Sequence, residues 1–276
     1  MSTQDWIIAF DRLKQWGLMR VDLSGGEPTM RHDLPEIAWS AVNAGINVVI
    51  STNGLVIKEK SLEEYPKVRW HVSLDSGIEV IHERSRLLPV LKPSTGSFRR
   101  ATDFLRSCIH QGCDVRVLTC LGPHNRDQLF ALGEHLALTG VKEWNLSRVL
   151  RAGRAQSDYE NLWAVAEEGI LEQLAYLRKA FPFIRIRYST RSEQNGYFLL
   201  VLPDGSLATQ RTDGNDKVAL GDLFNMTLED LQFSSEFDLA EHGRKWISST
   251  LEWQPFCLQC SPELWDPLPA DSCLAV

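Results

Sequence analysis

The pattern of apolar and polar positions switches repeatedly between two periods from residue 4 to about residue 180. Stretches with apolar residues at helical spacing take turns with short runs rich in β-branched residues, which predicts alternating helices and strands. The predicted helices span 4–16, 33–44, 97–111, 126–138 and 159–180. The predicted strands span 20–23, 47–50, 69–73, 114–119 and 143–147. Because this alternation is typical of parallel βα units, we expect an α/β domain over residues 1–180.

The pattern changes after residue 180. Short segments at 184–188, 196–202 and 206–209, the last two joined by a Pro203-Asp204-Gly205 turn, predict antiparallel strands. Thr227, with Asp230 three residues later, predicts the start of a short helix over 227–232. Several prolines follow residue 253 and predict an irregular end. We therefore expect a smaller α+β appendage over residues 181–276.

Composition narrows the class of protein. A formal charge of −7 argues against a strongly basic nucleic-acid surface, so we expect no nucleic-acid partner. An apolar share of 43% is that of an ordinary globular protein. No run of about 18 apolar residues occurs, and the start lacks the basic and apolar regions of a signal peptide, so we expect a cytoplasmic protein without membrane contact. The cysteines are not spaced as a disulfide framework and are expected to be mostly reduced thiols.

Polar side chains and glycines follow the first three predicted strands. In α/β sheets ligands bind at the carboxyl ends of the strands, so these segments are read together. Paired glycines in the first segment let a ligand approach the backbone, and Glu27 offers a carboxylate to a cationic group. The second segment offers hydrogen-bonding groups that suit sugar hydroxyls. The three segments are Ser24-Gly25-Gly26-Glu27-Pro28, Ser51-Thr52-Asn53-Gly54 and Ser73-Leu74-Asp75-Ser76.

In this order and at these spacings, the segments resemble the motifs of the radical S-adenosylmethionine (SAM) enzymes. The resemblance spans roughly residues 1–235 and is strong as a series, although each motif alone is weak. Further along the chain, several motifs resemble the same family and its peptide-modifying branch. They are His82-Glu83, Arg86, Gly96-Ser97-Phe98, Asn125 and Arg151-Ala152-Gly153-Arg154-Ala155.

The resemblance implies a partial (β/α)6 barrel with SAM held at the strand ends. By position, Gly25, Gly26 and Glu27, followed by Pro28, would hold the methionine amino group. Ser51 and Asn53 would face the ribose, Ser73 the sugar or the carboxylate, and Arg86 the methionine carboxylate. The alternative is that these glycine and asparagine residues form turns in a barrel of another purpose.

Members of this family bind a [4Fe–4S] cluster through a Cys-x-x-x-Cys-x-x-Cys loop that follows the first strand. This sequence has no cysteine before Gly25, and its first predicted element is a helix, so we expect the first strand and the cluster loop to be absent together. Either the sequence is truncated at its amino terminus, which we favour because the SAM-facing groups remain, or the protein has lost its cluster. In both cases we expect no radical chemistry from this sequence as it stands. We also expect the strand at 20–23 to lack a neighbouring strand, so that the helix at 4–16 covers its edge, or the chain self-associates or expresses poorly.

The end of the chain resembles the auxiliary-cluster (SPASM/twitch-like) domain of peptide-modifying members. The resemblance lies at 202–207, 219–223 and 227–231, but Gln210 stands where that domain carries its first cysteine. A weak metal site would have three thiolates, from Cys257, Cys260 and Cys273. A full structural site requires four ligands. The alternative is a proline-rich tail that binds no metal.

The function implied is that of a radical SAM enzyme. In complete form it would cleave SAM with a [4Fe–4S] cluster, aided by a reducing partner such as flavodoxin or ferredoxin, and abstract hydrogen from a peptide or small molecule. A nucleotide substrate, as in viperin-like enzymes, is an alternative. A second class is a cluster-free pseudoenzyme that binds SAM or a peptide as a scaffold. Outside the motifs, His71 shares a strand face with Ser73 and is expected to be a buried, hydrogen-bonded residue.

Overall fold

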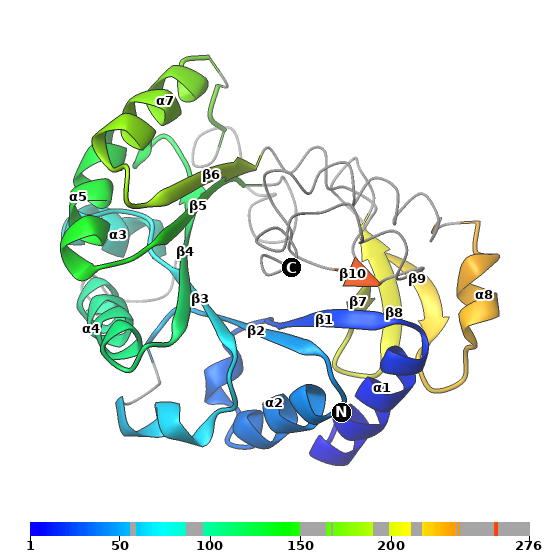
Figure 1. Ribbon diagram of the computed structural model, residues 1–276. Coiled ribbons are helices and arrows are strands. Elements are labelled where there is room, and N and C mark those ends of the chain that lie inside the picture. Colours follow the sequence, from blue (N-terminus) through cyan, green and yellow to red (C-terminus); the bar gives the residue numbers. More distant parts are fainter. Residues whose placement is uncertain are drawn as a thin grey trace.

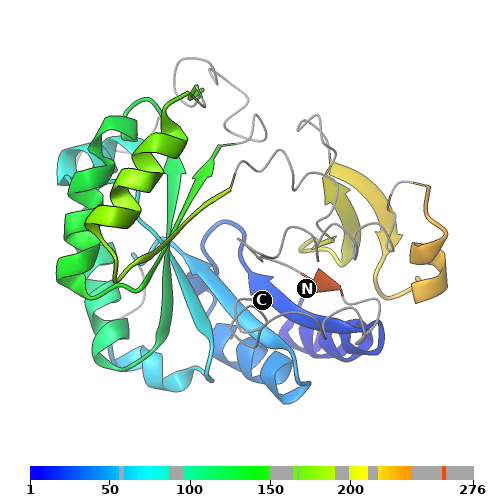
Figure 2. The same cartoon turned by 45° about the horizontal axis from the view of Figure 1, so that its top comes forward.

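The computed structural model describes residues 1–55, 59–86, 96–149, 164–166, 168–189, 199–210, 217–235, 237 and 257–258. Its main sheet is curved, and its parallel strands follow one another in chain order (Figures 1 and 2). These strands are β1 (Leu18–Leu23), β2 (Asn47–Thr52), β3 (Arg69–Ser73), β4 (Asp114–Leu121), β5 (Glu143–Arg148) and β6 (Arg185–Ser189).

Helices lie on the outer, convex side of the curved sheet (Figure 1). They are α1 (Thr3–Gln15), α2 (Leu34–Asn43), α3 (Glu79–Arg86), α4 (Ser97–His110), α5 (Leu129–Thr139) and α7 (Ile170–Ala180). Short 3-10 turns occur at η1 (Pro28–Met30), η2 (Glu59–Glu64) and η3 (Arg126–Gln128). The predicted α/β class and partial barrel are confirmed.

The core lies between the outer face of the sheet and these helices. On β3, Trp70 is 2% exposed and its ring meets Phe104 of α4 edge-on, with 5.3 Å between ring centroids. Trp144 and Leu146 of β5 are likewise fully buried. Because side chains alternate along a strand, residues between these apolar ones face the concave side. The sheet therefore has an apolar outer face and an inner face that carries its polar residues.

A second, antiparallel sheet contains β7 (Leu200–Val201), β8 (Ser206–Gln210) and β9 (Lys217–Asp222). The strands predicted at 196–202 and 206–209 are present where the structure describes them, whereas β9 was not predicted. Helix α8 (Leu228–Gln232) begins as predicted, because Thr227 and Asp230 form a reciprocal capping box.

Two predicted elements need correction. The strand predicted at 184–188 as antiparallel is wrong: β6 is parallel to β5, with Arg185 opposite Glu143, so the main sheet continues past the boundary predicted after residue 180. The helix predicted over 159–180 begins only at Ile170, because Gly169 before it has a left-handed φ of +76° and residues 164–166 are not helical. Residues 159–163 lie outside the described part. Helix α3 had no counterpart in the prediction.

The outer edge of β1 pairs with β10 (Cys257–Leu258), which runs antiparallel to it. Leu18 lies opposite Leu258, and Arg20 lies opposite Cys257. The expectation that this edge lacks a neighbouring strand is therefore wrong, because β10 pairs with it. Within the described ranges, no helix combines the length and the apolar content needed to cross a bilayer.

Candidate functional site

The carboxylate of Glu27 joins the ends of β1 and β2. Its Oε1 accepts hydrogen bonds from the Thr29 amide at 3.2 Å, the Thr29 hydroxyl at 2.5 Å and the Thr52 hydroxyl at 2.6 Å. Its Oε2 accepts one from the Asn53 amide at 2.8 Å. Glu27 is also the N-cap of η1, where Pro28 is buried at the first position. Since each carboxylate oxygen offers about two lone pairs, Oε2 keeps acceptor capacity that the described contacts do not use.

The two glycines before Glu27 leave open space beside the backbone. Gly25 has φ +134°, a conformation that side chains rarely adopt. A Cβ built on either Gly25 or Gly26 would meet no atom within 4 Å. The backbone of this turn therefore allows the close approach of a ligand.

The residues after β2 are held by hydrogen bonds to their neighbours. Ser51 donates to Asp22 Oδ1 at 2.7 Å, and Asn53 Oδ1 accepts from the Leu55 amide at 2.9 Å. Thr52 accepts from the Gly54 amide at 3.0 Å while donating to Glu27. Thr52 was not among the predicted site residues, although its position between Ser51 and Asn53 was the available signal. The structure thus brings the predicted residues of the first and second segments together.

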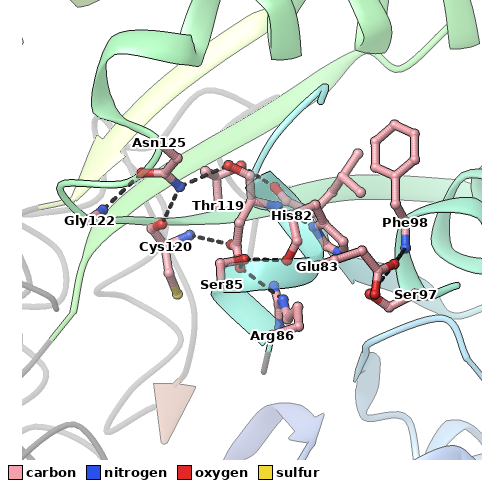
Figure 3. A network of polar contacts seen from close by, with 12 residues as sticks. His82, Glu83, Ser85, Arg86, Ser97, Phe98, Thr119, Cys120, Gly122 and Asn125 are labelled. Carbon is pink, nitrogen blue, oxygen red and sulfur yellow. Dashed lines mark hydrogen bonds and ion pairs between the residues drawn. The ribbon is translucent and has the colours of Figure 1, made fainter. Parts of the chain in front are cut away.

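Asp75, just beyond β3, organises a second network with β4 and α3 (Figure 3). Its Oδ1 accepts from the Cys120 amide at 3.0 Å, and its Oδ2 accepts from the Ser85 hydroxyl at 3.0 Å. The same Oδ2 lies 2.8 Å from Arg86 Nε. Asp75 itself is 3% exposed, so this is a buried carboxylate whose charge is balanced by Arg86.

Asn125 ties the ends of β3 and β4 together (Figure 3). Its amide nitrogen donates to the carbonyls of Asp75 and Cys120, each at 2.8 Å, and its Oδ1 accepts from the Gly122 amide at 2.9 Å. Because Asn125 is 0% exposed, these bonds satisfy a polar side chain that would otherwise be costly to bury.

The His82-Glu83 motif has structural contacts in this network. His82 Nδ1 accepts from the Asp75 amide at 3.1 Å, and burial, followed by the charge of Arg86, lowers the pKa of His82 to about 4. Glu83 Oε1 accepts from the Ser97 hydroxyl and the Phe98 amide, each at 2.9 Å, at the start of α4. A carboxylate at a helix N-terminus is favourable, so Glu83 anchors α4.

Arg86 is 28% exposed, and its contact with Asp75 uses the Nε side of the guanidinium. Ser73 lies at the end of β3 and is half-buried. Parallel pairing places Ser51 beside His71 and Thr52 beside Val72, so Ser73 lies at the same strand-end edge as the second segment.

The sequence profile of the radical SAM superfamily matches residues 1–135. The chain belongs to the radical SAM superfamily. Among curated relatives, the radical SAM chain is 32% identical over 157 residues to Fe-coproporphyrin III synthase of Methanosarcina barkeri, covering 56% of this chain and 38% of that protein. It is 23% identical over 181 residues to the sporulation killing factor maturation protein SkfB of Bacillus subtilis, covering 64% of this chain and 42% of that one. The chain thus spans less than half the length of these relatives.

Solved structures agree with the fold of this radical SAM chain. The structure of anSMEcpe with bound AdoMet and the Kp18Cys peptide has a TM-score of 0.63 at 14% identity, covering 86% of this chain and 73% of that one. Streptococcus suis SuiB bound to S-adenosylmethionine has a TM-score of 0.54 at 16% identity, covering 69% and 43%. At these identities the likeness concerns the fold alone.

The described residues of this radical SAM chain do not fit an iron–sulfur cluster. Cys108, Cys113 and Cys120 are free thiols on α4, after it and on β4, and burial raises the pKa of the Cys108 thiol. No group of three His, Cys, Asp or Glu side chains in the described part is arranged to hold a metal ion. Cys257 lies in β10, whereas Cys260 and Cys273, like Arg151 and Arg154, lie outside the described residues.

Proposed function

We propose that this chain binds SAM at the carboxyl ends of β1, β2 and β3, as part of a radical SAM enzyme that modifies a peptide or small molecule. The observation that carries the proposal is the turn of Gly25, Gly26 and Glu27. Its backbone is open to a ligand, and the Glu27 carboxylate is fixed by three neighbouring residues. Fixed acceptors of this kind suit an ammonium group.

In this proposal each end of SAM meets a different strand end. The carbonyls of the glycine pair and Glu27 Oε2 accept hydrogen bonds from the methionine ammonium. Ser51 and Asn53 face the ribose. Arg86, oriented by Asp75, receives the methionine carboxylate, and Ser73 contacts the sugar or that carboxylate.

The reaction of the complete protein is proposed from family membership: reductive cleavage of SAM by a [4Fe–4S] cluster and an electron donor such as flavodoxin or ferredoxin, followed by hydrogen abstraction. No step of that reaction is assigned to a described residue, because the described thiols do not form a cluster site. A SAM-binding scaffold without radical chemistry is the second candidate.

The names of the relatives support the proposed substrate classes. SkfB is a maturation protein, and SuiB has been solved bound to precursor peptide SuiA. Fe-coproporphyrin III synthase has a small-molecule product by name, and probable GTP 3′,8-cyclases of Saccharolobus islandicus are also similar. A peptide or a small molecule therefore remains the proposed substrate, with a nucleotide as the alternative.

The test is calorimetric titration of the chain with S-adenosylhomocysteine, comparing the wild type with Gly26→Ala. The added methyl group has open space and no positive φ to oppose it, so the variant should fold normally. It would nevertheless stand where the ligand approaches the backbone, and we expect at least a tenfold weaker dissociation constant, equivalent to about 1.4 kcal/mol.

Arg99→Ala, at an exposed position of α4, is the control and should bind like the wild type. Equal affinity of the wild type and Gly26→Ala would refute the proposed site. Failure of the wild type to bind at millimolar ligand would refute the binding function itself.

A further inference from the structure

A cluster of buried and half-buried arginines lines the concave face of the sheet, below the strand ends. The arginines come from four strands. We call them the interior arginine cluster: Arg20 of β1, Arg69 of β3, Arg116 of β4 and Arg187 of β6. These arginines were not among the predicted site residues, although the alternation of charged and apolar residues on β3, β4 and β6 was a usable signal.

Strand register places the cluster on one face. His71 lies opposite Arg116, and Arg116 lies opposite Glu143, in adjacent parallel strands. Trp70, next to His71 on β3, packs outward on Phe104 of α4, so His71 faces inward. Arg116 and His71 therefore lie side by side in the interior of the partial barrel.

Nearby carboxylates balance the positive charge of the cluster only in part. Glu143 Oε2 accepts from Arg116 Nε at 2.8 Å and Nη2 at 2.5 Å, and it also lies 3.7 Å from Arg69 Nη1. Asp22 Oδ2 lies 3.7 Å from His71 Nδ1. The other acidic partner, Asp114, pairs with Arg69 at the rim, where its side chain is 46% exposed. Two buried arginines, Arg20 and Arg116, and two half-buried ones, Arg69 and Arg187, thus share two inward carboxylates.

Lowered pKa values show that the positive charges of this cluster are destabilised. Burial, with added repulsion from Arg116 and Arg69, lowers the pKa of Arg20 to about 9 despite the nearby Asp22. Burial and Arg116 likewise lower the pKa of Arg187 to about 10. Buried cations in excess of their partners favour the entry of an anion, which would restore the lost pairing.

A polar atom of Arg116, and one of the neighbouring His71, are left without a hydrogen-bond partner in the described part of the chain. Arg116 Nη1 and His71 Nε2 are buried and make no hydrogen bond to the part of the chain that is described. The residues themselves are 1% and 2% exposed. Buried polar atoms are nearly always paired in folded proteins, so adjacent exceptions indicate a missing ligand.

We propose that the interior arginine cluster binds an oxyanion of the substrate, a carboxylate or a phosphate group, at Arg116 Nη1 and His71 Nε2. The inference rests on the proposed function and deepens it by naming the charged group that the substrate carries. His71 precedes Ser73 by two residues on one strand face, so the bound oxyanion lies roughly 7 Å from the strand-end site. A substrate held there by its anionic end extends toward the proposed SAM site.

The test uses the whole chain and two probes, inorganic phosphate and succinate, titrated calorimetrically at constant ionic strength. The informative variant is Arg116→Gln/Glu143→Gln, which removes the cation together with the carboxylate that it contacts, so that the net charge of the site is unchanged. We expect at least a tenfold weaker dissociation constant for the probe that the wild type prefers. Tighter binding of succinate would indicate a carboxylate on the substrate, and tighter binding of inorganic phosphate would indicate a phosphate group. Arg116→Lys, which keeps the charge but loses the planar fork, should weaken binding by a smaller factor and covers the case in which the double variant does not fold.

Arg99→Gln/Asp103→Asn, an exposed pair on α4, is the matched control and should bind the probes like the wild type. Failure of the wild type to bind either probe, or equal binding by the wild type and the Arg116 variants, overturns the inference. S-adenosylhomocysteine is titrated into the same proteins. If the wild type binds S-adenosylhomocysteine but neither anion, the anion site is refuted and the proposed function stands. If it binds an anion but not S-adenosylhomocysteine, the proposed function is refuted and the anion site stands.

Discussion

The Glu27 carboxylate at the end of β1 accepts a hydrogen bond from the backbone amide of Asn53, just after β2, at 2.8 Å. A single side chain thereby fixes the separation of two strand ends at the proposed SAM site. The bond pairs an ionised acceptor with a backbone donor, a combination roughly twice as strong as a neutral pair.

Thr52→Val should destabilise the chain by about 1.5–3 kcal/mol, because it removes a hydrogen bond to the Glu27 carboxylate and leaves the Gly54 amide without its partner. Chemical denaturation measures the free energy of unfolding. Thr139→Val, which removes a bond to a backbone carbonyl within α5, is the control and should cost less. If both variants lose the same free energy of unfolding, the hydrogen bond to the Glu27 carboxylate is no stronger than one to a backbone carbonyl.

Asn125→Ala should be more damaging, with a loss of about 3 kcal/mol or more, because two buried carbonyls and the Gly122 amide lose their partner together. Asn225→Ala removes an exposed contact with Asp222 and should change stability by less than about 0.5 kcal/mol. A small effect at Asn125 would mean that water replaces its amide.

Gly77→Ala tests how tightly the loop after β3 packs on α5. The new Cβ would lie 2.3 Å from the Ala131 carbonyl oxygen, and backbone at that distance must move. We expect a loss of about 1–3 kcal/mol or more, as for other overpacked sites. Gly26→Ala, whose methyl group meets open space, is the matched control and should leave the melting temperature unchanged. A wild-type melting temperature for Gly77→Ala would contradict the close packing.

His82 makes stability depend on pH. Its pKa is about 4 in the folded chain and about 6.5 when unfolded, so the unfolded state binds more protons between these values and stability falls as pH drops below about 6.5. Going from pH 7 to pH 5 should cost about 2 kcal/mol through this residue.

His82→Asn offers an acceptor to the Asp75 amide without titrating, so its unfolding free energy should fall less steeply with acid than that of the wild type. The comparison isolates His82 from the other buried histidines, because they are present in both proteins. Parallel pH profiles would contradict the lowered pKa of His82.

The sequence predicts the sheet and the strand-end motifs because both depend on local order: alternating periods, glycine positions and the residues after each strand. It does not show that Arg86 contacts Asp75, or that Thr52 rather than Ser51 holds Glu27, because those partners are chosen by the packing of distant segments. The segment at 184–188 was misassigned for a related reason. A short strand carries no mark of whether its neighbour runs parallel or antiparallel.

The most direct test of SAM binding at the strand ends is a crystal structure of the chain with S-adenosylhomocysteine. We predict ligand density at the ends of β1, β2 and β3, with the amino group within hydrogen-bond distance of the Gly25 or Gly26 carbonyl and of Glu27 Oε2. Ligand density at any other place, or none at saturating millimolar ligand, would contradict it.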